Sequence, residues 1–340
     1  MTVRESYEES VDRALRRIRD HIPEDLVQQF ADKSGITEEH IHPIHPGQSG
    51  IVSAVDGSNA MIAEGGSVSL AAIRAARTTF SGNERTGRSV TPLTLVTIGP
   101  GHRNLDFDEM FEECFGIPPH KGLDNSDPER ASGILRDTLE YWVAKKTAQI
   151  LPAGSLLLMD GALRVSSQNH EPVLADIIKT AAERNLLLAA VAKRTRATWG
   201  GGHPLLPALG GLVAQLGITG PWWTKIELHL LDNTEYRQGR HGEIYVASLH
   251  PRFSRLMKME LPKGTGNPGE TMQALAACAD DGRIPGYPYP LLDAHRTVAI
   301  DEALVMQIQH DLKSGLSNKG ITNRTFEDLF GDLHGDFERY

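Results

Sequence analysis

Two short, mostly apolar runs in this chain each end at an aspartate that a glycine follows. The first extends from Ile51 to Val55 and stops at Asp56, and the second extends from Leu156 to Met159 and stops at Asp160. Runs of this length are typical of buried β-strands. A carboxylate at the end of a buried strand loses hydration and needs a compensating partner. Taken singly, each Asp-Gly pair is also what a strand-ending turn would contain.

Taken together, the two aspartates constrain the fold much more. If the two strands are neighbours in one sheet, Asp56 and Asp160 lie side by side. Two carboxylates that close do not both stay ionised without a counter-charge. Mg²⁺ and Mn²⁺ prefer carboxylate oxygens and water as ligands. A pair of such ions about 4 Å apart can hold the attacking and leaving oxygens of a phosphoryl transfer. The pattern therefore predicts a divalent-metal site.

A helix predicted over 129–151 offers a third carboxylate, because it directly precedes the second strand and can pack over the sheet. Glu140 flanks the apolar stripe of this helix, and Arg136 lies one turn earlier, where it can steady Glu140. The helix dipole explains Glu129 at the helix start, and Asp137 is expected to point away from the stripe. A solvated surface glutamate remains the alternative interpretation of Glu140.

The order of the predicted elements favours an α/β fold, in which helices cover the faces of one mixed sheet. Residues 100–130 are expected to form an insertion or a functional loop. An aspartate on the first strand, a glutamate on the helix and an aspartate on the fourth strand resemble the ribonuclease-H-like fold of many metal-dependent nucleases. Strands are expected over 50–56, 66–80, 93–99, 155–160, 186–193, 223–231 and 242–250, and helices over 4–32 (one helix, or two divided at Pro23), 129–151, 171–185, 267–282 and 291–313.

Charge and composition exclude several classes of protein. The net charge of −9 counts against a simple DNA-binding module, because phosphate contacts need Lys and Arg, but not against an enzyme with a local basic groove. No apolar run approaches the ~18–20 residues that span a bilayer, and the N-terminus lacks the apolar core of a secretory signal. We therefore expect a cytoplasmic protein with no membrane contact. Cys114 and Cys278 are too few for a disulfide framework or a cysteine zinc site.

Five segments, in this order, resemble the NurA nuclease family: AVDGSNA (54–60), ILRDTLEYW (134–142), LLLMDGAL (156–163), VAKRT (191–195) and IPGYPYPLLDAHRTVAI (284–300). The resemblance implies a ribonuclease-H-like nuclease domain over 47–313 with helical insertions, between an N-terminal helical segment (1–46) and a C-terminal tail (314–340). It implies a homodimeric, Mn²⁺-dependent DNA nuclease with 5′ to 3′ exonuclease and single-strand endonuclease activity. Two ions are expected, with Mg²⁺ as an alternative. The implied partner is a HerA-type hexameric ATPase in the end resection of DNA double-strand breaks.

The resemblance also implies roles for particular residues. The metal ligands would be Asp56, Glu140, Asp160 and His295, and Lys193 and Tyr287 would complete the catalytic site. Lys193 would hold a phosphate oxygen or the charge of the attacking water. Tyr289 is the alternative to Tyr287. Only the spacing of eight residues between Tyr287 and His295 favours Tyr287. Phosphate and stacking contacts to DNA are assigned to Lys193, Arg194, Arg196, Trp199, Arg252 and Arg255.

Two other classes of function remain open from the sequence. A non-catalytic loading adaptor for a DNA translocase would bind its partners, but it would not need three acids at one point. An actin-like or sugar-kinase-like phosphotransferase uses a related fold, with a phosphate loop of the form Asp-x-Gly-Thr/Ser. Here Gly57 and Ser58 follow Asp56 directly, so the spacing of that loop is wrong.

Overall fold

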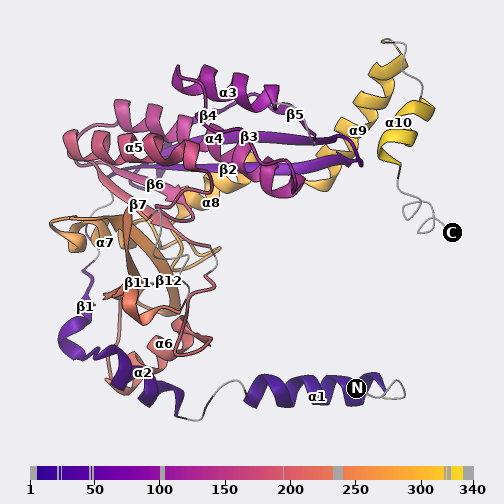
Figure 1. The fold of residues 1–340 in the computed structure, drawn as a ribbon. Helices are drawn as coiled ribbons and strands as arrows, with labels where there is room; N and C mark the ends of the chain where they lie inside the picture. The colour runs from indigo at the N-terminus through magenta and orange to yellow at the C-terminus, as the bar shows by residue number, and fades with distance from the viewer. Residues whose placement is uncertain are drawn as a thin grey trace.

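A single mixed sheet forms the centre of the molecule (Figure 1). The computed structural model describes residues 6–20, 23, 25–45, 47, 50–99, 104–193, 195–232, 240–317, 319 and 323–331. Within these residues the sheet has ten strands, in the order β1-β10-β11-β12-β7-β6-β2-β3-β4, and β5 also pairs with β3. Their bounds are β1 (His42–Pro43), β2 (Ile51–Glu64), β3 (Ser69–Ser81), β4 (Glu84–Val90), β5 (Thr94–Ile98), β6 (Leu156–Asp160), β7 (Leu187–Val191), β10 (Trp222–Ile226), β11 (Gly242–His250) and β12 (Phe253–Pro262). A separate pair joins β8 (Thr198–Trp199) and β9 (His203–Pro204).

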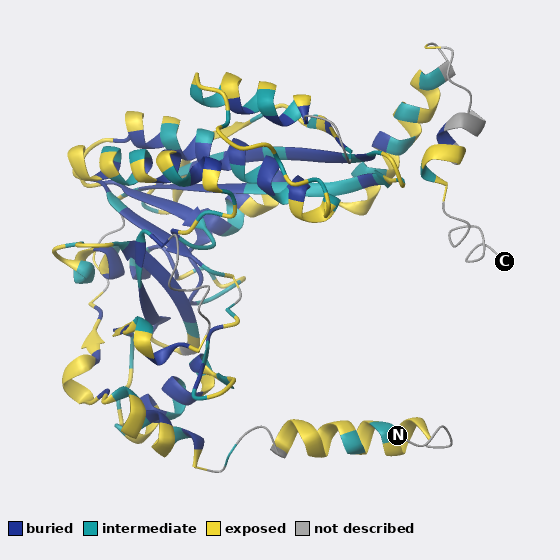
Figure 2. Ribbon diagram, in the orientation of Figure 1, coloured by how far each residue is buried: buried dark blue, intermediate teal, exposed yellow. Residues whose placement is uncertain are grey.

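Helices cover both faces of the sheet, and the buried residues concentrate between the helices and the strands (Figure 2). One face of the β2–β7 region packs against α3 (Leu105–Phe115), α4 (Pro128–Ile150) and α5 (Glu171–Glu183). The other face packs against α7 (Pro268–Ala277) and α8 (Tyr289–Val298). The helices α2 (Leu26–Ser34) and α6 (Leu205–Gln215) cover the β10–β11 end of the sheet. The helix α9 (Glu302–Ser317) packs on the far end of β2, and α10 (Asn323–Phe330) contacts α9. In Figure 1, α1 (Tyr7–Asp20) projects from the body.

The strand directions match the predicted ribonuclease-H-like arrangement. The strands β2, β3 and β4 are antiparallel neighbours, whereas β6 and β7 run parallel to β2. Both faces of β2 are covered, so Ala54 packs toward α8 and Val55 packs toward α4. This two-sided burial explains why residues 51–55 are mostly apolar, with Ser53 as the exception. The predicted fold class, an α/β mixed sheet with flanking helices, is confirmed.

The prediction that the first strand ends at Asp56 is wrong. The strand β2 continues to Glu64, because β3 pairs with it along its whole length, from Ile51 opposite Ser81 to Glu64 opposite Ser69. Gly57 therefore lies inside a strand and not in a turn. By contrast, β6 does end at Asp160, and Gly161 follows with a φ of 93°, a conformation that favours glycine.

Other elements differ from the prediction where the sequence lacks an apolar period. The edge strand β4 and the strand β12 were not expected, and α3 lies inside the predicted loop of 100–130. The helix predicted over 291–313 is two helices, because the Asp301 side chain accepts a hydrogen bond from the Leu304 amide (2.9 Å) and starts α9 there. The N-terminal helix is divided near Pro23, as one of the two predicted alternatives has it.

Among the described residues, none of the helices combines the length and the apolar character needed to cross a bilayer. The domain limits at 46/47 and 313/314 stay predictions. The helix α2 belongs to the predicted N-terminal segment (1–46) and packs against α6 of the predicted nuclease domain (47–313). The helix α10 belongs to the predicted C-terminal tail (314–340).

Candidate active site

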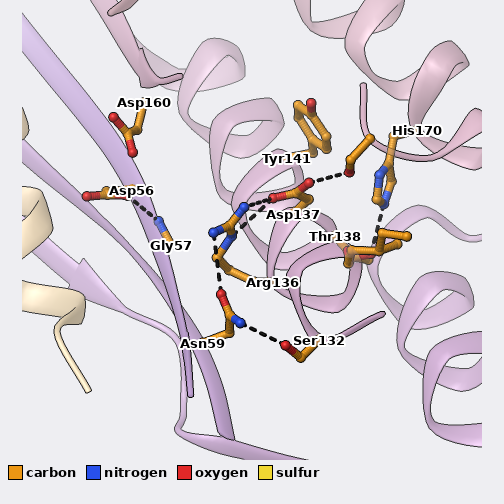
Figure 3. Close-up of polar contacts among 12 residues, drawn as sticks. Asp56, Gly57, Asn59, Ser132, Arg136, Asp137, Thr138, Tyr141, Asp160 and His170 are labelled. Carbon is orange, nitrogen blue, oxygen red and sulfur yellow. Dashed lines mark hydrogen bonds and ion pairs between the residues drawn. The ribbon is translucent and has the colours of Figure 1, made fainter. Parts of the chain in front are cut away.

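Asp56 and Asp160 lie side by side, because β2 and β6 are parallel neighbours with Val55 opposite Met159 (Figure 3). The ammonium of Lys193 donates to Oδ2 of Asp56 at 2.7 Å and to Oδ2 of Asp160 at 2.9 Å. Since the two distances meet at the same nitrogen, the two oxygens are no more than about 5.6 Å apart. The side chain of Asp56 is buried, and that of Asp160 is 24% exposed. The predicted pairing of the two aspartates therefore exists in the fold.

Lys193 reaches both carboxylates because it follows β7, which runs parallel to β6 and ends at the same edge of the sheet. Burial disfavours its charge, but Asp160 and Asp56 together hold the pKa of Lys193 above its usual value. Burial and the charge of Asp56 raise the pKa of Asp160, and Lys193 opposes that shift. One ammonium thus offsets the repulsion between two adjacent carboxylates.

His295 of α8 joins this cluster from the opposite side of the sheet layer. Its Nδ1 lies 3.0 Å from Oδ2 of Asp56 and 3.1 Å from Nζ of Lys193. One ring nitrogen cannot donate to Asp56 and accept from Lys193 at the same time, so the tautomer decides which contact is a hydrogen bond. About half of the His295 side chain (51%) is exposed, so the ring also faces incoming solutes.

Of the two tyrosines, Tyr287 is the one whose hydroxyl is influenced by the charges of the cluster. The hydroxyl of Tyr287 is buried and has no hydrogen-bond partner among the described residues. Burial first, and then the charges of Asp160 and Asp56, raise the pKa of Tyr287 above its usual range. Tyr289 turns away, because its hydroxyl donates to the Gly82 carbonyl and its ring packs on Phe80. The structure therefore places Tyr287 near the two aspartates and Tyr289 among other partners, and the role of Tyr287 stays a prediction.

Glu140 of α4 lies over β2 at Gly57, the residue that follows Asp56. A β-carbon at residue 57 would lie 2.8 Å from Cγ of Arg136 and 3.1 Å from Oε2 of Glu140. Glu140 is buried, and burial is the largest reason why its pKa lies well above its usual value, followed by the charge of Asp137. Asp56 and Asp160 raise that pKa further. The charges of the two aspartates therefore act on Glu140, which lies against β2 from the α4 side, whereas Asp56 contacts His295 of α8.

A polar network from α4 supports this packing (Figure 3). The Arg136 guanidinium contacts Asp137 and the Asn59 side chain, and Asn59 donates to Ser132 at 2.7 Å. Asp137 also accepts from Ser166. Sequence reasoning found Arg136 but not Asn59, Ser132 or Ser166, because only the packing of α4 on β2 brings them together. The expectation that Asp137 points away from the apolar stripe agrees with these polar partners.

The backbone that follows Asp160 is fixed by a buried ion cluster. The Glu260 side chain accepts from the Leu163 amide at 3.1 Å, and it also binds the Lys258 ammonium at 2.6 Å and the Arg240 guanidinium. All three charged side chains are nearly inaccessible to solvent. The cluster holds the turn after β6 against β12, and with it the position of Asp160.

The donor set suits a divalent cation in charge and in atom type. Asp56, Asp160 and Glu140 provide carboxylate oxygens, and Oδ1 of Asp160 is buried without a hydrogen-bond partner among the described residues. Within that part of the chain, no three His, Cys, Asp or Glu side chains stand ready-made as a metal-binding group. The positive charge between the two aspartates is instead Lys193. The residues therefore fit a metal in chemistry, and the metal roles of Asp56, Glu140, Asp160 and His295 stay predictions.

The residues predicted to contact DNA differ in their exposure to solvent. Trp199 is wrong as a stacking residue, because it is buried (2% exposed) and packs edge-on against Phe30. Arg196, Arg252 and Arg255 are exposed, so they remain free to contact a polyanion. Arg194 lies outside the described residues.

Comparison with known proteins decides the family. Residues 50–300 of the chain match the NurA domain. The chain belongs to the NurA family. The matched region contains Asp56, Glu140, Asp160, Lys193, Tyr287 and His295, and its limits agree with the segments that carried the resemblance.

Solved NurA structures have the same fold. The chain is similar to the NurA nuclease from Sulfolobus solfataricus, with a TM-score of 0.57 and 16% identity, over 94% of this chain and 98% of that chain. A second NurA crystal structure gives a TM-score of 0.54 at 10% identity, over 92% and 98%. A structure of NurA with manganese gives 0.48 at 10% identity, over 91% and 98%. No curated protein matches the sequence. At these identities the first two matches, with TM-scores above 0.5, establish only the fold of this NurA family member.

Proposed function

We propose that this NurA family protein is a metal-dependent nuclease that hydrolyses phosphodiester bonds in DNA. The observation that carries the proposal is the pairing of Asp56 and Asp160 on adjacent parallel strands, both bound by Lys193. A structural ion pair would need one carboxylate, whereas here two meet one ammonium, and their charges also act on a third carboxylate, Glu140. Such an excess of acidic groups suits the binding of cations.

The roles follow from where each group lies. Asp56, Glu140 and Asp160 would hold the metal, with His295 at the exposed side. Bound Mn²⁺ or Mg²⁺ would lower the pKa of a coordinated water and neutralise charge on the phosphate. Lys193 keeps its charge and is partly exposed, so its ammonium can donate to a phosphate oxygen. Tyr287 supplies a buried hydroxyl that can donate a hydrogen bond to the substrate.

The finer assignment rests on the family. We infer a preference for Mn²⁺, two ions, 5′ to 3′ exonuclease and single-strand endonuclease activity, a homodimer, and work with a HerA-type hexameric ATPase in DNA end resection. The family match over residues 50–300 supports these inferences. Co-elution of the purified chain with a HerA-type hexamer is the measurement for the partner, and separate peaks would contradict it.

The test of catalysis uses end-labelled linear DNA with Mn²⁺ or Mg²⁺. We expect metal-dependent shortening by the wild-type chain and a loss of at least about 100-fold in Asp56→Asn and Asp160→Asn, because each removes a charged ligand. Asp176→Asn is the matched control, since Asp176 is a surface carboxylate paired with Lys145. Circular dichroism checks that all variants fold. Digestion by Asp160→Asn at the wild-type rate would exclude this site.

A further inference from the structure

Two adjoining hollows lie on the α4 face of the sheet, on either side of Trp142. Their volumes are about 270 and 390 Å³. Both are lined by Thr91, Pro92 and Trp142, so they adjoin along these residues. We call the smaller one the basic hollow, because its charged lining residues are Arg77 and Lys146. We call the larger one the acidic hollow, because its charged lining residues are Asp106, Glu109 and Glu113.

The register of β3 turns Arg77 toward the basic hollow. Arg77 lies opposite Val55 on β2 and opposite Ser89 on β4, and Val55 packs toward α4. Residues directly opposite each other in an antiparallel pair point to the same face of the sheet. The Nε of Arg77 is buried and has no hydrogen-bond partner among the described residues. Because a buried donor without a partner is costly, an acceptor in the hollow would stabilise this side chain.

The basic hollow has an excess of positive charge. Neither Arg77 nor Lys146 has an ion-pair partner among the described residues, and those that line the hollow include no carboxylate. Ser89 adds a hydroxyl to the same lining. A guanidinium and an ammonium at one point, with a hydroxyl beside them, are the groups that bind a phosphate. The chemistry of the basic hollow therefore suits one phosphate group.

The space in the basic hollow suits more than a phosphate. At about 30 Å³ for each water molecule, its volume holds about nine waters, which exceeds the space that one phosphate group fills. Trp142 and Lys146 are four residues apart on α4, so they lie on one face of the helix. The indole of Trp142 offers a flat surface on which a nucleobase can stack. The ligand therefore carries a ring next to its phosphate.

Beyond Trp142 the surface changes sign. Glu109 and Glu113 are four residues apart on α3 and are exposed. Asp106 is held in place because its carboxylate accepts from the Thr97 amide at 2.6 Å. These carboxylates would repel a second phosphate, which counts against a nucleic acid strand, but they can accept a hydrogen bond from the amino group of a base. The two hollows together therefore suit one phosphate and one base.

We propose that the two hollows bind a nucleoside monophosphate, with its phosphate at Arg77 and Lys146 and its base beside Trp142, facing the acidic hollow. This site is separate from the proposed catalytic site. Asp56 contacts His295 on the α8 side of the sheet, whereas Arg77 lies on the α4 side. The proposal therefore goes beyond nuclease activity and does not depend on it.

Equilibrium dialysis of labelled dCMP against the full-length chain tests the proposal. A chelator is present, so that dCMP cannot bind through a metal ion at the aspartates. We expect a dissociation constant in the micromolar to millimolar range. Arg77→Met and Lys146→Met should each raise it about tenfold or more, because each removes a charged donor to the phosphate. Quenching of tryptophan fluorescence by dCMP should be lost in Trp142→Phe.

Arg88→Met is the matched control for the loss of an arginine from this edge of the sheet. Arg88 lies opposite Thr78, whose hydroxyl donates to the Pro290 carbonyl of α8, so Arg88 is on the other face. This variant should bind dCMP like the wild type. Circular dichroism checks that all variants fold. Asp160→Asn should also bind dCMP like the wild type, so loss of catalysis and loss of nucleotide binding are separable.

Four related ligands test the parts of the proposal. Deoxycytidine lacks the phosphate and inorganic phosphate lacks the base, so both should bind at least about tenfold more weakly than dCMP. The ligand dUMP lacks the amino group and should also bind more weakly, and equal binding of dUMP would overturn the placement of the base. Absence of dCMP binding at millimolar concentration would overturn the proposal, as would binding that Arg77→Met and Lys146→Met leave unchanged. A single-stranded oligonucleotide that binds more tightly than dCMP and requires Arg77 would assign the hollows to a strand and also overturn it.

Discussion

At the scale of single residues, the same dipeptide does two different things in this protein. Gly161 after Asp160 has a positive φ, so it turns the chain at the end of β6. Gly57 after Asp56 lies in the middle of β2, and its missing side chain lets Arg136 and Glu140 of α4 come down onto the strand. The first role depends on the backbone of glycine and the second on its lack of a β-carbon.

The close approach at Gly57 predicts the effect of adding one methyl group. In Gly57→Ala, the β-carbon would overlap Arg136 and crowd Glu140, so α4 must shift away from β2. We expect a loss of about 1–3 kcal/mol in the free energy of unfolding, measured with urea. Cleavage of DNA should fall by more than the fraction unfolded explains, because Glu140 moves away from Asp56.

Gly133→Ala is the control for that change. Gly133 lies in α4, and a β-carbon there meets no atom within 4 Å. Alanine should stabilise the helix by about 0.5–1 kcal/mol and leave cleavage unchanged. A Gly57→Ala protein as stable and as active as Gly133→Ala would contradict the packing described for α4 and β2.

At the scale of elements, His170 joins α4 to the start of α5. Its Nε2 lies 2.9 Å from Oγ1 of Thr138, whose hydroxyl donates to the Ile134 carbonyl, so Nε2 must be the donor. The other ring nitrogen is buried, with no partner among the described residues. Burial lowers the pKa of His170 to about 4. The neutral ring is therefore part of the contact between the two helices.

This shift predicts the pH dependence of stability. Because the folded-state pKa lies below the unfolded-state value of about 6.5, the unfolded chain takes up the proton first as pH falls. The contribution of His170 is complete above about pH 6.5 and is lost toward pH 4, a change of about 3 kcal/mol. Urea unfolding at pH 7, 6 and 5 measures it. The difference between wild type and His170→Asn should shrink as the pH falls, and a constant difference would contradict the buried neutral ring.

Sequence patterns predicted those elements whose own residues carry the signal. The strands β2, β6 and β7 and the helices α4 and α5 have apolar runs or stripes, and these place Asp56, Asp160 and Glu140. The strand β4 has the sequence ERTGRSV and is almost wholly exposed, so its pairing with β3 determines it and its own residues do not. The stacking role predicted for Trp199 is wrong because its partner, Phe30, is distant in the sequence, and the glycine-rich residues that follow Trp199 give no sign that it is buried. The full length of β2 was likewise set by β3 and not by local sequence.

At the scale of the whole molecule, one sheet carries the site at the junction of its antiparallel and parallel halves. The strand β2 belongs to both halves, since it pairs with β3 on one side and β6 on the other. The cluster at Asp56 is therefore held by backbone pairing from two directions. This arrangement gives a scaffold that does not depend on loops to bring its acidic groups together.

Metal removal should therefore leave the fold intact. Lys193 already offsets the charges of Asp56 and Asp160, so we expect the melting temperature of the wild type to be unchanged by a chelator. Added Mn²⁺ at about 100 times its dissociation constant should stabilise the chain by about 2.7 kcal/mol. Lys193→Met should melt lower in chelator and recover with Mn²⁺, because its two carboxylates then lack a counter-charge. Chelator-induced unfolding of the wild type would contradict this.

The lysine between the two aspartates also separates the folding of the chain from the binding of a metal ion. Because Lys193 neutralises both aspartates, the chain can fold before any metal ion is present. For the metal-dependent nuclease that we propose, folded but inactive molecules would then form when the ion is scarce. Their activation would require only the binding of an ion and no new synthesis of the protein.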